Sequence, residues 1–222
     1  MALNGSFIKE LYYDKKFFYS ISTRYANVIQ VSACNIVNIR FSDGMYYSKK
    51  LLLGEYEDIG FPVVFKQMFG KKRADILGTG TVSLYLISKK FRDVLIENQI
   101  TGWKTFDVKI YDKKENEIDG YYGLTVTGRS GPMEFKESEI IEKRLVPHGP
   151  LSKYYVGCWI DMQSWDGSDF FVIAQSTHII ISNKVYEIIK ANNITNIDMS
   201  DISEIEFDEF QVNMVLQKRD IN

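Results

Sequence analysis

A stretch of the chain recurs 94 positions further on, and this internal similarity constrains the fold more than any other feature of the sequence. Residues 84–106 align with residues 178–200 without a gap. Self-similarity at a fixed offset usually means that one supersecondary unit is used twice, with each copy burying its apolar face against the other or against a shared sheet. The identical pairs are Ile87/Ile181, Ser88/Ser182, Lys90/Lys184, Asn98/Asn192, Ile100/Ile194 and Thr101/Thr195, and further upstream Asp75 aligns with Asp169.

The repeated stretch predicts a strand, a capped helix and a return strand. Residues 82–87 and 177–181 are short apolar runs that suit buried strands. The serine that follows, Ser88 or Ser182, is suited to accept hydrogen bonds from the amides that open a helix. Apolar residues then fall three, six and seven positions after that serine, on one helical face. We expect the helices to end near Asn98 and at Asn192-Asn193, because asparagine tolerates the left-handed conformation.

The remaining segments favour strands, so we predict an α+β fold with mostly antiparallel sheet and two short helices in a tandem strand-helix-strand repeat. The aromatic-rich N-terminal part predicts strands at 25–29, 35–41 and 45–52, with a turn at 42–44. Residues 103–111 and 121–127 predict a hairpin with a long polar turn. The proline-containing stretch 145–150 suits a connector between the two copies.

These boundaries divide the chain into three segments. They are a β-rich N-terminal segment (1–70), a first repeat half (71–146) and a second repeat half (151–222), which together also suit one compact unit. A chain of 222 residues buries roughly 70% of its extended surface on folding, and 45% of its residues are hydrophobic. This composition excludes a disordered or fibrous chain.

Charge and the chain ends exclude several classes of function. The 27 Lys and Arg residues are balanced by 29 Asp and Glu residues, which argues against a nucleic-acid-binding surface because phosphate neutralisation needs a surplus of basic residues. The N-terminus lacks the basic and apolar regions of a signal peptide, and no uncharged run reaches the roughly 20 apolar residues needed to cross a bilayer. Cys34 and Cys158 have no metal-ligand spacing. We therefore expect a cytoplasmic protein with two free thiols, no metal and no cofactor.

Two lysines at the start of the expected helices are candidates for anion binding. Lys90 and Lys184 would lie beside free helix amides, an arrangement that suits a phosphate or a nucleotide. The alternative, which we favour, is that they are solvated surface lysines that oppose the helix dipole at small cost. The glycine-rich stretch 128–131, with Arg129, could also cradle a phosphate, but a turn that leaves a strand explains it more simply.

The most distinctive short motif is Trp-Asp-Gly-Ser-Asp-Phe-Phe at residues 165–171. Its composition predicts an Asp-Gly turn with side-chain capping before a buried strand, anchored by the tryptophan. A cation would bind its two aspartates only if other oxygen ligands joined them. We therefore assign the motif a structural role, carried by Trp165, Asp166, Gly167 and Asp169.

An acidic strip follows the second repeat copy and is the candidate partner-binding surface. Residues 198–209 contain six acids and no base. Such a strip along a strand edge could steer a basic protein partner and protect the edge from aggregation, although a solvated face is the simpler interpretation. The acids are Asp198, Asp201, Glu204, Glu206, Asp208 and Glu209.

A catalytic site is the alternative from another class of function. Cys158 lies close in sequence to Asp161, and His148 is one of two histidines in the chain. A cysteine nucleophile needs a base within hydrogen-bonding reach, so this hypothesis requires the three side chains to meet in a pocket. The second histidine, His178, lies in an apolar run and is interpreted as a core or edge residue.

The repeat and the tryptophan motif together resemble a known bacterial family. The resemblance rests on residues 88–95, 100–103, 120–124, 165–171, 181–184 and 192–196, and it covers roughly residues 75 to 210. The chain resembles the small cytosolic immunity proteins of polymorphic toxin systems, of the myxobacterial type. The resemblance implies a non-enzymatic binder that neutralises a cognate toxin of the same cell or its kin. Related proteins with paired CxxCG motifs bind metal, but this chain lacks those motifs, so neither a zinc site nor a catalytic residue is carried over.

The leading hypothesis is therefore a protein-binding module that acts by surface complementarity. An inhibitor needs a rigid scaffold and a charged rim for fast association, and it needs no reacting group. The alternatives are an enzyme with a site assembled from distant segments and an anion or nucleotide sensor that uses Lys90 and Lys184. We expect a cognate protein partner and neither nucleic acid nor membrane as a ligand.

Overall fold

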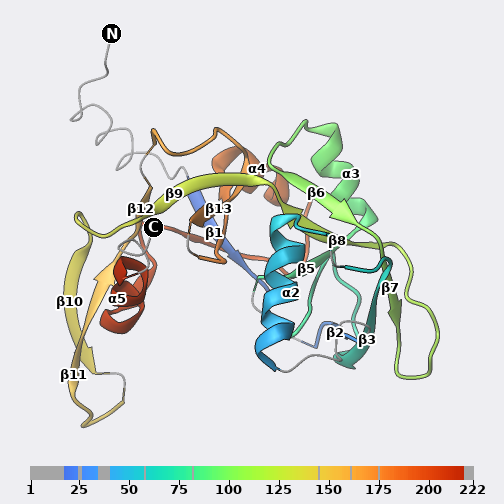
Figure 1. Cartoon of the computed structure of the whole chain (residues 1–222), viewed down its shortest axis with the longest axis horizontal. Coiled ribbons are helices and arrows are strands. Elements are labelled where there is room, and N and C mark those ends of the chain that lie inside the picture. The colour runs from blue at the N-terminus through green and yellow to red at the C-terminus, as the bar shows by residue number, and fades with distance from the viewer. Residues whose placement is uncertain are drawn as a thin grey trace.

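Runs of β-branched and aromatic residues make strands the main element of this chain, as the computed structural model shows (Figure 1). The structure describes residues 18–24, 27–34, 41–57, 59–81, 83–144, 146–160, 162–174 and 176–217, without the side chains of 41–46, 214 and 217. The elements in chain order are β1 (Phe18–Ser22), β2 (Gln30–Ala33), α2 (Phe41–Leu53), β3 (Val63–Phe69), β4 (Ile76–Gly78), β5 (Tyr85–Ser88), α3 (Lys89–Glu97), β6 (Trp103–Phe106), β7 (Val108–Tyr111), β8 (Tyr121–Val126), β9 (Gly128–Glu134), β10 (Glu139–Arg144), β11 (Leu151–Val156), β12 (Trp159–Ile160), β13 (Phe170–Ala174), β14 (Ile179–Ser182), α4 (Asn183–Ala191), β15 (Asp198–Asp201), β16 (Glu206–Asp208) and α5 (Glu209–Gln217).

The described strands form four sheets, and the predicted α+β class with mostly antiparallel pairing is confirmed. The largest sheet has the order β12-β9-β13-β14-β1-β15, and a second sheet has the order β4-β5-β8-β6. Two three-stranded sheets have the orders β2-β3-β7 and β10-β11-β16. Among these pairs only β9 with β13 and β3 with β7 run parallel.

The N-terminal strands enter sheets built by later parts of the chain. β1 lies between β14 and β15, and it pairs antiparallel with both. β3 pairs with β7, which comes from the predicted first repeat half. Strands from all three predicted segments therefore share sheets.

The two similar stretches occupy corresponding places in their sheets. In one sheet Ile76 of β4 faces Ile87 of β5, and in the other Phe170 of β13 faces Ile181 of β14. Phe170 and Ile181 of the second pair lie 94 positions after Ile76 and Ile87 of the first. The next neighbour is β8 for β5 and β1 for β14, so the second sheet takes its equivalent strand from the N-terminus.

Both serines occupy the predicted helix N-caps, but only one caps with its side chain. The hydroxyl of Ser88 accepts from the backbone amide of Phe91 at 3.1 Å, as predicted. Ser182 makes no such bond, although its hydroxyl donates to the carboxylate of Asp169 at 2.9 Å as that of Ser88 does to Asp75. The prediction of a side-chain cap is therefore wrong for the second helix.

The helix exits follow the prediction in part: Asn193 adopts the left-handed conformation, whereas Asn98 does not. Asn98 and Asn192 have φ angles of −91° and −95°, and the left-handed residues are their successors, Gln99 and Asn193, with φ of 52° and 49°. Asn98 and Asn192 each donate from the side-chain amide to a carbonyl one helical turn back. The same carbonyl also accepts from the asparagine's own backbone amide, so the side chain adds a second hydrogen bond at each helix end.

Two strand predictions in the N-terminal part need correction. Residues 45–52 belong to helix α2, which also contains the predicted turn at 42–44. Ser48, Leu51 and Leu52 are buried while Lys49 is exposed, which is the spacing of a helix face that we overlooked in the sequence. Of the predicted strand at 25–29, only Val28 forms a single bridge and residues 25–26 lie outside the described residues, as do 35–40 of the next predicted strand.

The predicted hairpin is present as the antiparallel pair β6 and β8. After Asp107 the chain leaves that pair, and β7 joins β3 in a different sheet. The proline-containing stretch does not connect two halves: residues 146–150 close the β10–β11 hairpin. The glycine-rich stretch at 128–131 is also not a turn, since it lies within strand β9.

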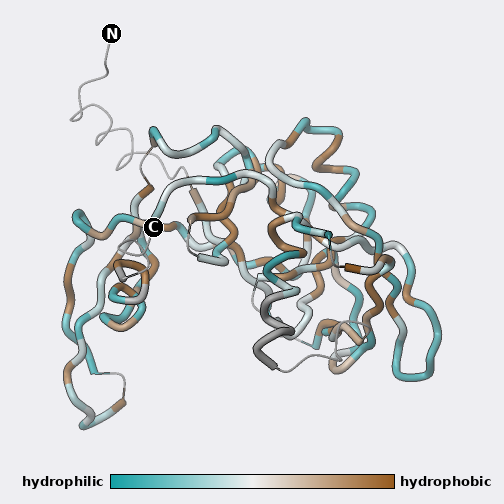
Figure 2. The backbone as a smooth tube through the Cα atoms, viewed as in Figure 1, coloured by the Kyte–Doolittle hydropathy of each residue, from teal (hydrophilic) through white to brown (hydrophobic). Residues whose placement is uncertain are grey.

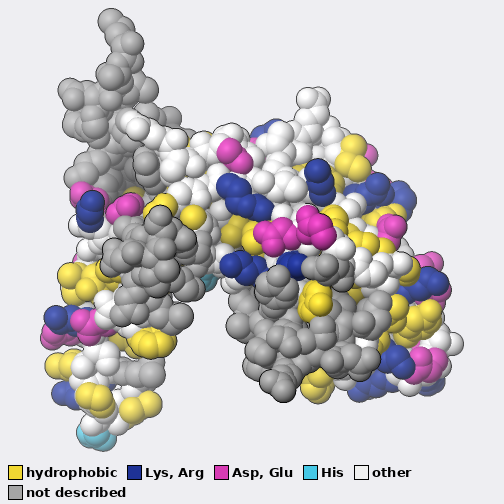
Figure 3. Space-filling model, in the orientation of Figure 1, with side chains coloured by type: hydrophobic (Ala, Val, Ile, Leu, Met, Phe, Trp, Pro, Cys, Tyr) yellow, Lys and Arg dark blue, Asp and Glu magenta, His cyan; other side chains and the backbone are white. Residues whose placement is uncertain are grey.

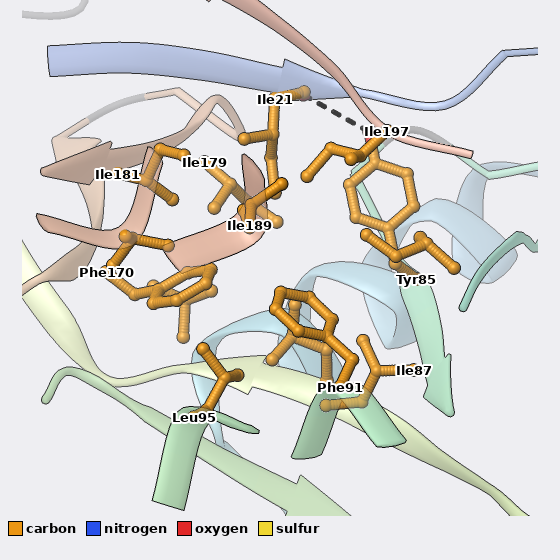
Figure 4. Packing of buried hydrophobic residues seen from close by; sticks show 14 of the residues in the cluster. Ile21, Tyr85, Ile87, Phe91, Leu95, Phe170, Ile179, Ile181, Ile189 and Ile197 are labelled. Atoms are coloured by element: carbon orange, nitrogen blue, oxygen red, sulfur yellow. Dashed lines mark hydrogen bonds between the residues drawn. The ribbon is translucent and has the colours of Figure 1, made fainter. Parts of the chain in front are cut away.

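The central core joins the two similar stretches. Phe91 and Leu95 of α3 and Ile189 of α4 belong to one buried cluster that also contains β-strand residues from both sheets. In Figure 4, Phe91 and Leu95 lie across from Phe170 in this cluster. Figure 2 shows the same distribution, with hydrophobic segments in the central strands and a hydrophilic loop after β7. The burial of these faces accounts for the close association of the two sheets.

Candidate functional site

Two aspartates join the similar stretches by hydrogen bonds that run in both directions between them. The carboxylate of Asp75 accepts from the hydroxyl of Ser88 at 2.8 Å, and it accepts from the amide and hydroxyl of Thr195, each at 2.9 Å. The carboxylate of Asp169 accepts from the hydroxyl of Ser182 at 2.9 Å and from Thr101 at 3.0 and 3.1 Å. Each carboxylate therefore binds its own helix-capping serine and a threonine from the other stretch.

The candidate anion-binding lysines also join the two stretches. Lys90 Nζ lies 3.3 Å from the carboxylate of Asp75 and donates to the carbonyl of Asn193 at 3.1 Å. Lys184 Nζ lies 3.6 Å from the carboxylate of Asp169 and donates to the carbonyl of Gln99 at 3.3 Å. Each lysine thus spans both stretches, and an external anion would compete with an aspartate already in place.

Several interactions act on the pKa of Asp75. Burial alone would raise it, but the hydrogen bonds from Thr195 and Ser88 and the charge of Lys90 outweigh that effect and lower the pKa below its ordinary value. The folded protein therefore favours the ionised carboxylate.

The tryptophan motif forms a turn that fastens β9 to β13. Asp166 accepts from the amide of Ser168 at 2.9 Å and from the amide of Arg129 at 2.8 Å. Gly167 adopts a φ of 82°. The indole of Trp165 packs against Phe18, with ring centroids 5.1 Å apart. The polar atoms of this turn are engaged by the backbone.

Of the six acids of the acidic strip, two lie on β15, two on β16, one in the turn between these strands and one at the start of α5. Asp198 pairs with Arg24 at 2.5 Å, and Glu206 pairs with Lys143. Asp201 is buried and accepts from the amide and hydroxyl of Ser203. Asp208 accepts from the amide of Gln211 at the start of α5, where Glu209 is exposed. The strip is therefore not one continuous negative surface.

Two adjoining hollows lie between helix α4 and the edge strand β15. Their volumes are about 450 and 410 Å³, and they share Tyr186 and Met199 as walls. We call the pair the α4–β15 groove. Three of the predicted acids line it, and Arg24 and Lys190 add positive charge at one end. The lining of the groove includes Arg24, Tyr186, Lys190, Asp198, Met199, Asp201 and Glu204.

A second surface, the arm, carries exposed apolar side chains. The β10–β11 hairpin extends away from the body of the molecule, with α5 beside its base (Figure 1). Five large hydrophobic residues with 41–71% exposure lie on this hairpin and helix, and Figure 3 shows hydrophobic and charged side chains interspersed along the projecting part. We call these five residues the arm surface: Ile140, Val146, Leu151, Phe210 and Leu216.

Sequence reasoning missed both surfaces. The proline-containing stretch was assigned to a connector, so the hairpin it closes was not considered. Ile140 and Ile141 precede that turn, and Tyr154, Tyr155 and Val156 follow it; these β-branched and aromatic residues were the available signal. The groove had no local signal, since Arg24 and Tyr186 are far from β15 in sequence.

The structure separates two members of the alternative catalytic site, and the third, Asp161, lies outside the described residues. Cys158 follows the base of the β10–β11 hairpin, and His148 lies in the turn at its tip. Five strand steps between base and tip correspond to about 17 Å, which is too far for proton transfer. Burial raises the pKa of the Cys158 thiol to about 12. His178 is exposed just before β14, with its ring 6.1 Å from that of Phe207.

These environments predict unequal thiol reactivity. At about pH 8 we expect one fast-reacting thiol, the exposed Cys34, because a thiol with a pKa near 12 provides almost no thiolate. Cys158 should react only after unfolding. Titration with a chromogenic disulfide reagent, with and without urea, measures both rates, and Cys34→Ser identifies the fast thiol. Rapid modification of folded Cys34→Ser would contradict the burial of Cys158.

Searches for a metal site, a membrane span and relatives give three findings. Within the part of the chain that the structure describes, no group of three or more His, Cys, Asp or Glu side chains is placed to hold a metal ion. None of the described helices has the length and apolar character needed to span a membrane. Comparison of the sequence with known protein families and with curated proteins gives no match.

Proposed function

We propose that this chain is a protein-binding module of the bacterial cytoplasm that neutralises a cognate toxin by direct binding. The observation that carries the proposal is the arm surface, where exposed apolar side chains are concentrated on a projecting hairpin and an adjacent helix. Contiguous exposed apolar surface with a polar rim is typical of protein interaction sites. The choice of a toxin as partner rests on the resemblance to immunity proteins of polymorphic toxin systems.

Charge around the arm surface supports this function. Phe210, the most exposed of its five side chains, follows the exposed Glu209 directly in α5, whereas Glu206 on the adjacent strand β16 is already paired with Lys143. Acids at the rim of an apolar surface raise the association rate with a basic partner. Part of the acidic strip is thus proposed to act as a rim and not as the main contact. A basic protein is the partner expected, with neither nucleic acid nor membrane as a ligand.

We further propose that the two similar stretches are tandem copies of one strand-helix-strand unit. Three features support this: matched strand registers at an offset of 94, the reciprocal carboxylates, and equivalent contacts of the helices. In α3, Arg92 lies over the ring of Tyr122, and in α4, Tyr186 stacks on Tyr19. A duplicated scaffold tied together in this way would supply the rigidity that an inhibitor needs.

The proposal predicts that the arm surface decides neutralisation. The probe is the C-terminal domain of a modular toxin encoded beside this gene, with growth rescue and binding to an inactivated domain as readouts. We expect Ile140→Asp combined with Phe210→Asp to abolish rescue and to weaken binding by about 100-fold or more, because central apolar contacts contribute about 2 kcal/mol or more each.

Ile96→Asp is the matched control, since Ile96 is also exposed, at 53%, but lies on α3. It should bind and rescue like the unmodified protein. Failure of the unmodified protein to bind or rescue would contradict the toxin proposal. Equal loss in Ile96→Asp would contradict the assignment to the arm.

A further inference from the structure

Strand β15 presents an open edge beside the α4–β15 groove. Among the described strands it pairs with β1 alone, at the end of the six-stranded sheet. The amide of Ile202 donates to the carbonyl of Phe18 at 3.2 Å. Antiparallel bonding alternates, so the peptide groups of Ser200 also face β1, and those of Met199 face away from it. The edge therefore has main-chain groups available to another strand.

The two walls of the groove suit an apolar side chain between them. The ring of Tyr186 is stacked on that of Tyr19, with centroids 4.1 Å apart and an interplanar angle of 13°. This stacking holds the wall on the helix side in place. Met199 forms the wall on the strand side, and its thioether side chain adapts to different neighbours.

The two ends of the groove carry opposite charge. At one end Lys190 and Arg24 outnumber Asp198, which is paired with Arg24. At the other end are the carboxylates of Asp201 and Glu204. The strand from Asp198 to Asp201 advances about 10 Å, which is the span of a short extended peptide.

From these three observations we infer that the α4–β15 groove binds an extended segment of another protein, which adds to the sheet as a strand beside β15. The segment has an acidic residue for the Lys190 end, an apolar residue for Tyr186 and Met199, and a basic residue for the Glu204 end. Side chains at alternate positions of a strand point to one face, so these three residues are spaced two apart. Recognition of this kind takes affinity from main-chain hydrogen bonds and specificity from the side chains.

This inference does not depend on the toxin proposal, because the groove and the arm lie on different sheets. It assigns Asp201 and Glu204 to a peptide site, and it assigns the same site a positive end that the sequence did not indicate. The hollows are too small for a folded domain and adjoin along the edge of β15, which is why an extended segment is the occupant proposed.

Two labelled heptapeptides test the inference, acetyl-Thr-Glu-Thr-Val-Thr-Lys-Thr-amide and its reversed sequence. Fluorescence anisotropy with the full chain should show binding of one order, with a Kd of about 10–100 µM, and about tenfold weaker binding of the other. Lys190→Glu combined with Glu204→Lys exchanges the charged ends. This variant should prefer the other peptide order.

Main-chain pairing is tested separately by N-methylation of the bound peptide. Methylation of alternate amides on the side facing β15 should reduce affinity by about tenfold or more, because each removes a strand hydrogen bond, and methylation of the intervening amides should not. Lys104→Glu, on the edge strand β6 of the other sheet, is the matched control and should bind both peptides like the unmodified protein. The inference is overturned if binding of neither peptide saturates below about 1 mM. It is also overturned if the charge exchange leaves the peptide preference unchanged, or if both methylation patterns have the same effect on affinity.

Discussion

Gly102→Ala is expected to prevent folding or to reduce the free energy of unfolding by about 4 kcal/mol or more. Gly102 has a φ of 81°, and a Cβ placed there would lie 2.0 Å from the carbonyl oxygen of Phe170. That oxygen belongs to a buried strand, so neither partner can move without breaking sheet pairing. Left-handed strain and the clash with the backbone therefore add together.

Gly120→Ala is the matched control for this prediction. Gly120 has nearly the same φ, 80°, but nothing lies within 4 Å of its Cβ position. Only the left-handed strain remains, so the expected cost is about 1–2 kcal/mol. Urea unfolding followed by circular dichroism measures both variants. Equal losses would show that the approach of Gly102 to Phe170 is not as close as described.

Asp75→Asn is expected to reduce the free energy of unfolding by about 2–4 kcal/mol at neutral pH. The amide would lose the charge opposite Lys90, and its NH₂ group would face donors from Ser88 or Thr195. Asp93→Asn is the control, because Asp93 forms an exposed pair with Lys89 one helical turn away. That pair is exposed to solvent, so its loss should change the free energy of unfolding little. Urea unfolding at pH 7 should separate the two variants.

The effect of Asp75 should depend on pH in a definite direction. Because its pKa is lowered in the folded protein, the unfolded chain binds the proton more readily. The stabilisation is therefore complete above the ordinary aspartate pKa of about 3.9, and it is lost as the pH falls through the lower pKa of the folded state. The difference in stability between the unmodified protein and Asp75→Asn should shrink over that range. A difference that stayed constant down to about pH 2 would contradict the lowered pKa.

Local patterns in the sequence predicted several elements well. Helix α3 follows the serine and the apolar spacing that predicted it, and the β6–β8 hairpin follows its alternating pattern. Helix α2 was missed, because turn-forming residues near its start outweighed the apolar spacing that follows. The connector was misassigned because the same prolines and glycine that suit a linker also suit a hairpin turn.

The candidate sites were only partly accessible from sequence. The acids of the strip were identified, but their division between a groove and an arm depends on which sheet each strand joins. The lysines at the helix starts were identified as possible ligands of an anion. Only the fold shows that Lys90 lies next to the carboxylate of Asp75 and Lys184 next to that of Asp169.

By itself, the sequence determined the α+β class and the start of both short helices, and it showed the similarity between residues 94 positions apart. The tertiary structure decided that β1 lies between β14 and β15, that Thr195 and Thr101 bind the aspartates of the opposite stretches, and that β15 is an edge among the described strands. The physical reason is the range of the interactions. Helix spacing and capping act over a few residues and are visible in a short window, whereas strand pairing joins residues more than a hundred positions apart and leaves no local pattern that identifies the partner.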